Sequence, residues 1–137
     1  MKNHASQSDR DFHTAFESCT VAPTEFNHEA HLRLAYVYLV ENDLASAQRK
    51  MRGALLSFLA AYGIPPEKFH ETLTRAWVLA VRHFMSRSPS LCFSEFAAKS
   101  QPLLDSKVML THYSASVLFS PSARASYVEA DLVAIPQ

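Results

Sequence analysis

Residues 67–85 read EKFHETLTRAWVLAVRHFM, and this stretch decides the fold. Its apolar side chains recur at spacings of three and four, which places them on one broad face of a helix. They are Phe69, Leu73, Ala76, Trp77, Ala80, Val81 and Phe84. Because Pro65 and Pro66 precede the stretch, we expect one helix near residues 66–86, with Trp77 buried and its N–H hydrogen-bonded.

Helical spacing and helix-end signals recur along the rest of the chain. Asp9, Asn27 and Asp43 are suitable N-caps, and Gly63 is a suitable C-cap. Further helices are therefore expected near residues 10–19, 27–41 and 44–62, with shorter helical pieces after residue 87. No stretch alternates between apolar and polar residues as a strand does. The sequence predicts an all-α fold, a single-domain helical bundle with about four main helices and short C-terminal helices.

The length of 137 residues is that of one domain, and an apolar content of 48% is typical of globular proteins. No repeat or linker divides the chain. We expect residues 1–8 to form a flexible polar tail and residues 9–137 to form the single helical domain.

Charge and glycine content exclude several classes of function. Thirteen basic and thirteen acidic residues cancel, so no net field attracts nucleic acid or an anionic membrane. The longest apolar run, residues 34–40, is too short to span a bilayer, and the start lacks an apolar signal core, which favours a cytoplasmic location. Two glycines leave no glycine-rich loop for a nucleotide. The even charge balance is compatible with a homodimer.

Histidines on the inner faces of helices are the main candidates for chemistry. His28 and His31 are three residues apart, so they are neighbours on one helical face, which continues along an apolar stripe. On the long predicted helix, His70 lies on the same face as Thr74 and Trp77. His112 ends a short helical piece, LTHYS.

Two interpretations of these histidines remain open. Imidazole nitrogens suit zinc, copper and iron, so the leading hypothesis is a small cytosolic metalloprotein with a mononuclear site made by His28, His31 and His70. His112 or a water would complete the site, and open coordination positions would permit enzymatic chemistry, although the sequence names no reaction. In the other interpretation, each imidazole stays neutral and bonds a backbone carbonyl or a tyrosine.

Two functions without a metal are also compatible with the sequence. One is a pocket for a small aromatic or acidic molecule, lined by Tyr38, Trp77 and Phe84, with a histidine as the acid–base or hydrogen-bonding group. The other is a protein-interaction module in which the histidines are structural. Glu71 is turned about 100° from His70 on a helix, which favours a supporting or surface position over a ligand position.

Three segments resemble a group of small bacterial helical proteins without an established activity. The segments are FNHEAHLRLAYVYL, KFHETLTRAWVLAVRHFM and LLDSKVMLTHYSASVLFSPSAR, and the resemblance covers about residues 12–136. The shared pieces are FxHxxHLRLAxxYL, HETxTRxW, LLD and HYS. The resemblance implies a bacterial cytosolic helical protein. It draws attention to His28, His31, His70, Glu71, Thr74, Asp105, His112 and Tyr113.

Overall fold

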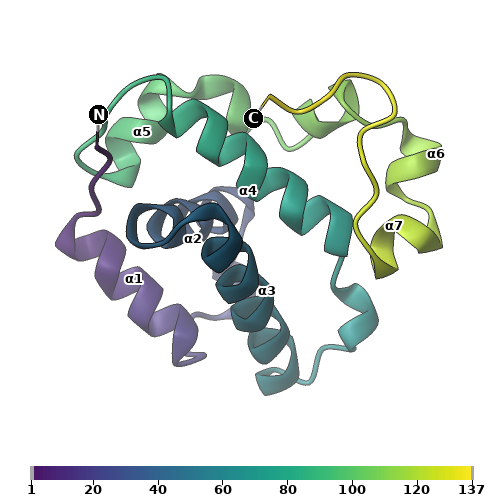
Figure 1. Ribbon diagram of the computed structural model, residues 1–137. Coiled ribbons are helices and arrows are strands. Elements are labelled where there is room, and N and C mark those ends of the chain that lie inside the picture. Colours follow the sequence, from purple (N-terminus) through teal and green to yellow (C-terminus); the bar gives the residue numbers. More distant parts are fainter. Residues whose placement is uncertain (1, 137) are drawn as a thin grey trace.

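The computed structural model describes residues 2–136, and within them every regular element is helical. The helices are α1 (Gln7–Glu17), α2 (His28–Glu41), α3 (Leu44–Ala61), α4 (Glu71–Met85), α5 (Phe93–Lys99), α6 (Ala115–Leu118) and α7 (Pro121–Ala125) (Figure 1). Short 3-10 turns connect them: η1 (Pro23–Glu25), η2 (Pro66–Lys68), η3 (Gln101–Leu104) and η4 (Val108–Thr111). The prediction of an all-α fold is confirmed.

The ends of α2 and α3 follow the signals in the sequence. Asn27 Oδ1 accepts a hydrogen bond from the Ala30 N–H at 2.9 Å, and Asp43 Oδ1 accepts one from the Ser46 N–H at 2.8 Å. Each side chain satisfies a backbone donor that has no partner inside its helix. Gly63 follows the end of α3 with a φ of +64°, a conformation that glycine adopts without strain.

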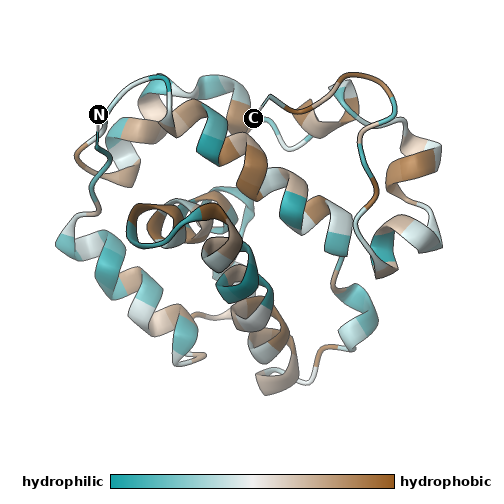
Figure 2. Cartoon of the chain, viewed as in Figure 1, coloured by the Kyte–Doolittle hydropathy of each residue, from teal (hydrophilic) through white to brown (hydrophobic). Residues whose placement is uncertain are grey.

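Helix α2 lies at the centre of the packing. It contacts α1, α3, α4 and α5, while α7 packs against α4 (Figure 1). The middle of α2 is fully buried, as expected for a helix covered on several sides. In Figure 2, α1 is mostly hydrophilic, consistent with its place at the edge of the molecule. The central position of α2 places its N-terminus against both α3 and α4.

The N-terminal residues, expected to form a polar tail, lie against the helices. The His4 N–H donates to the Ser90 carbonyl at 2.8 Å, and Asn3 Nδ2 donates to the Met85 carbonyl at 3.0 Å. Helix α1 begins earlier than predicted because Ser6, not Asp9, is its N-cap. Asn3 and His4 are thus tied to the end of α4 and to the segment that follows it.

Asp9 has a different structural role from the predicted cap. Its buried carboxylate accepts hydrogen bonds from the Ser6 and Phe93 N–H groups and from Arg33 Nε, each at 3.0 Å. Burial alone would raise the pKa of Asp9, but these donors outweigh it and hold the pKa below its usual value. Asp9 therefore joins α1 to α2 and to the start of α5.

The long helix predicted for residues 66–86 is divided in two. The turn η2 ends at Lys68, and α4 begins at Glu71, with His70 between them as the N-cap of α4. His70 has extended backbone angles, so the helical face that was expected to include it begins only after it. This break determines which way the His70 side chain points.

No helix within residues 2–136 combines the length and the apolar character needed to cross a membrane.

Candidate functional site

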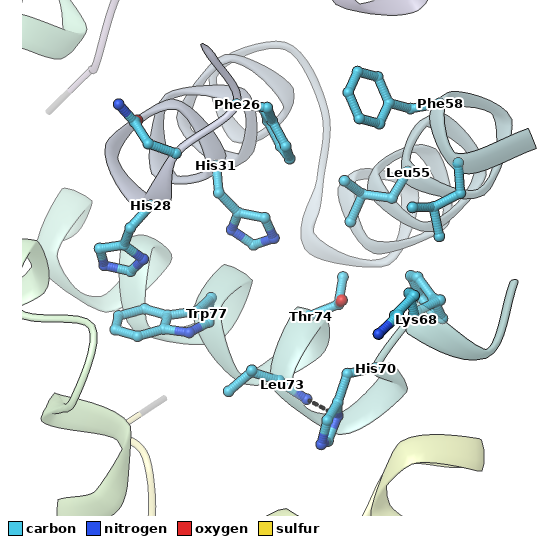
Figure 3. Close-up of a pocket in the computed structure, with 13 residues that line it drawn as sticks. Phe26, His28, His31, Leu55, Phe58, Lys68, His70, Leu73, Thr74 and Trp77 are labelled. Atoms are coloured by element: carbon cyan, nitrogen blue, oxygen red, sulfur yellow. Dashed lines mark hydrogen bonds between the residues drawn. The ribbon is translucent and has the colours of Figure 1, made fainter. Parts of the chain in front are cut away.

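A cavity of about 330 Å³ lies between the start of α2, the second half of α3 and the junction of η2 with α4. Its apolar wall consists of Phe26, Leu55, Phe58, Leu59, Phe69, Leu73 and Trp77. Its polar lining consists of Asn27, His28, His31, Lys68, His70 and Thr74 (Figure 3). A mainly apolar cavity of this size with a few polar groups is the usual form of a small-molecule site.

Phe26 shapes the α2 side of the cavity. It directly precedes the N-cap of α2 and packs on His31, four positions into the helix, with ring centroids 5.8 Å apart. This is the position of a hydrophobic staple, which fixes the angle at which the chain enters a helix. Phe26 also contacts Phe16 at 4.6 Å and Phe58 at 5.4 Å, and Phe16 stacks on Phe58 at 4.8 Å. These ring contacts fix the position of Phe26 in the wall.

His31 points from α2 into the cavity, and its imidazole makes no hydrogen bond to any residue in the range 2–136 (Figure 3). Burial lowers the pKa of His31 to about 4, with a smaller contribution from the neighbouring His28. The ring is consequently neutral at neutral pH. One ring nitrogen is then a donor and the other an acceptor, and both are available to a bound molecule.

Thr74 and Trp77 project from α4 toward the same space (Figure 3). Both are buried, Trp77 with only 4% of its surface exposed, so its predicted burial is confirmed. The predicted hydrogen bond is not found, because neither the indole N–H nor the Thr74 hydroxyl has a partner within residues 2–136. These two groups add a donor and a donor–acceptor to the cavity.

His28 lines the cavity but is held by the protein. Its Nε2 donates to the Leu103 carbonyl at 2.8 Å, and its ring meets the Trp77 ring edge-on at 4.6 Å. The bond joins the start of α2 to η3. His28 therefore supports the cavity and positions Trp77.

His70 lines the cavity wall, but both of its ring nitrogens are turned toward backbone groups. Nδ1 accepts from the Leu73 N–H at 3.0 Å (Figure 3), and Nε2 donates to the Leu118 carbonyl at 2.7 Å. Burial lowers the pKa of His70, and the positive charge of Arg124 contributes in the same direction. A neutral imidazole with both nitrogens engaged has no lone pair left for a metal ion.

His112 lies elsewhere in the molecule. Its Nδ1 donates to the Val133 carbonyl at 2.7 Å. Together with His83, Phe84 and Met109 it lines a separate cavity of about 220 Å³. The short C-terminal elements do not bring it to His28 and His31.

The metal-site hypothesis is therefore wrong. Across residues 2–136, no three side chains of His, Cys, Asp or Glu are grouped so that they could hold a metal ion. The physical reason is that backbone groups of η3 and α6 bind the imidazoles of His28 and His70, while His112 contacts the C-terminal segment.

Three further residues predicted to bind a ligand lie outside the cavity. The Tyr38 hydroxyl donates to Glu17 Oε2 at 2.7 Å. The pKa of Tyr38 is raised, chiefly by burial and secondly by this hydrogen bond to Glu17. The Tyr113 hydroxyl donates to the Val128 carbonyl at 2.6 Å. Glu71 accepts from Arg52 Nε at 3.0 Å on the surface between α3 and α4. Each of these polar groups already has a partner within the protein.

The sequence interpretation missed much of the wall that the structure shows. Leu55 and Phe58 were given no functional role, and Lys68 was placed inside the continuous helix predicted for residues 66–86. Phe26 carried a usable signal, since an apolar residue directly before an N-cap is typical of a staple. For Lys68 no local signal exists, because its position depends on the break at His70.

Comparison with protein-family models, with curated proteins and with solved structures finds no match for this chain.

Proposed function

We propose that the protein binds a small molecule with an aromatic or other apolar body in the cavity between α2, α3 and α4. The observation that carries the proposal is the imidazole of His31, which points into an aromatic-lined space with neither nitrogen hydrogen-bonded to the described residues. The Thr74 hydroxyl and the Trp77 N–H face the same space and have no hydrogen-bond partner among residues 2–136. Together they offer a fixed pattern of donors and acceptors on an apolar wall.

The surroundings of His31 favour a binding role. The residue is half-buried and its imidazole has no hydrogen-bond partner among residues 2–136, so only solvent satisfies its polar edge while the cavity is empty. His28 and His70 show that this fold can satisfy an imidazole with nearby carbonyl groups. His31 avoids that arrangement and leaves its polar edge toward the cavity, where a ligand can satisfy it.

Binding can be tested with the protein's own fluorophore. Trp77 is the only tryptophan of the chain and it lines the cavity, so its emission reports directly on occupancy. We expect a saturable change in Trp77 emission with benzyl alcohol, phenylethanol or cyclohexanol, accompanied by amide chemical-shift changes in α2 and α4.

A matched pair of variants separates the cavity from the rest of the surface. Leu73→Phe adds a ring at the cavity wall and should weaken binding, whereas Leu104→Phe, at another half-buried leucine outside the cavity, should not. The proposal fails if none of the three compounds shifts the resonances of cavity residues. It also fails if Leu73→Phe binds as tightly as the native protein.

A further inference from the structure

We infer that the ligand is an anion: a small acid whose apolar body fills the cavity and whose carboxylate lies between Lys68 and the polar edge of His31. This inference rests on the proposed binding function and names the chemical class of the ligand. It depends on the distribution of charge around the cavity and on the groups that remain without partners.

The lining of the cavity has one fixed charge, and it is positive. Of the thirteen lining residues, Lys68 is the only lysine or arginine, and none is an aspartate or a glutamate. The neighbouring depression across α2 has the opposite character, since Asp9, Glu25 and Glu29 all line it beside Arg33. An anion thus meets no like charge in the cavity.

Lys68 is placed to meet that anion at the rim. Its ammonium group extends toward the cavity from η2 and makes no ion pair with any residue between 2 and 136 (Figure 3). Arg124 Nη1 donates to the Glu67 carbonyl at 3.2 Å, which brings a second cation to the same turn. An unpaired ammonium beside an apolar cavity is complementary to an amphipathic acid.

The adjoining surface also favours an anion. A groove between α3 and α4 shares Phe69 and Thr74 with the cavity as a common wall. Its charged lining residues are Arg49, Arg52, Arg75, Glu71 and Glu129. Arg52 is paired with Glu71, which leaves Arg49 and Arg75 against Glu129, so this groove has a small excess of positive charge.

His31 supplies the inner contact and couples binding to protons. The titratable and charged groups around it are His28 on its own helix and Lys68 and His70 across the cavity, none of them acidic. Burial holds the pKa of His31 at about 4 in the empty cavity. A bound carboxylate would favour the imidazolium and raise that pKa, so affinity for the anion increases as the pH falls below the ordinary histidine range.

The test compares three probes of similar size by Trp77 emission: phenylacetate, its neutral amide phenylacetamide, and benzylsulfonate. At about pH 7 we expect the two anions to bind at least about fivefold more tightly than the amide. Lys68→Met should weaken the anions by about two- to fivefold and leave the amide unchanged. Lys107→Met, at an exposed lysine outside the cavity, is the matched control.

The proton coupling has its own readout. Benzylsulfonate stays ionised in acid, so its affinity should rise between about pH 7 and about pH 5 in the native protein, and this rise should be absent in His31→Gln. If the amide binds as tightly as phenylacetate and Lys68→Met changes neither, the anionic class is wrong while cavity binding stands. If no probe binds, both the inference and the proposed function are wrong.

Discussion

The two facing walls of the cavity each present a histidine from the beginning of a helix, and the two imidazoles are used differently. On the α4 wall, His70 is the N-cap, so its Nδ1 reaches the Leu73 N–H three positions along, and its Nε2 bonds the Leu118 carbonyl. On the α2 wall, His31 lies inside the helix, four positions after the N-cap Asn27. An N-cap side chain completes a helix, whereas a side chain one turn later points sideways. His70 is thus structural, whereas His31 keeps its polar edge free to bind.

The largest expected effect sharpens the structural side of this comparison. Trp77→Ala removes a buried indole that packs edge-on against His28, and should lower the free energy of unfolding by about 3–5 kcal/mol. Denaturant unfolding followed by circular dichroism measures the loss. Leu91→Ala, at a leucine that is 69% exposed, should change little. A loss below about 1 kcal/mol for Trp77→Ala would show that the α4 wall is not core.

Acid should destabilise the protein in part through His31 on the α2 wall. In the unfolded chain His31 takes up a proton near its ordinary pKa of 6.5, but in the folded protein only near about 4. Below pH 6.5 the unfolded state therefore binds more protons, and the free energy of unfolding falls as the pH is lowered. The loss attributable to His31 is at most about 3 kcal/mol, because the cavity edge of its ring is accessible to solvent.

The measurement is a series of denaturation curves between neutral pH and about pH 4, recorded for the native protein and for His31→Leu. The variant should show a shallower dependence on pH. The slope that remains includes His70, whose pKa is also lowered by burial. Equal slopes in the two proteins would contradict the assignment of a neutral, half-buried His31.

Loss of the cap on the other wall should have a smaller effect. His70→Ala removes the acceptor for the Leu73 N–H and the donor to the Leu118 carbonyl, which together should cost about 2 kcal/mol. His70→Asn should recover part of this loss, because an asparagine side chain can accept the same cap hydrogen bond. Identical unfolding curves for His70→Ala and the native protein would remove the contrast between the two walls.

The smallest effect has the opposite sign. His31→Leu replaces an unpaired imidazole with an apolar side chain against Phe26, and should raise the free energy of unfolding by about 1 kcal/mol at neutral pH. The same variant should bind phenylacetate more weakly than the native protein does. Destabilisation by His31→Leu would mean that His31 has a structural role, as His70 has.

The sequence alone determined that this protein is helical, where α2 and α3 begin, and that Trp77 is buried. Asn27 and Asp43 cap α2 and α3 as predicted. Trp77 is buried on the face that its spacing indicated. These features are local, since a cap needs only a side chain within three residues, and an apolar face needs only the helical repeat.

Only the tertiary structure decided what each histidine does. The spacing placed His28, His31 and His70 near the starts of two helices, and all three line one cavity. Their chemical state depends instead on which carbonyl groups lie opposite, and those belong to Leu103 and Leu118, 75 and 48 residues away in the chain. Periodicity in the sequence carries no information about such distant partners. For the same reason, the break at His70 placed Lys68 at the rim, which no local pattern could indicate.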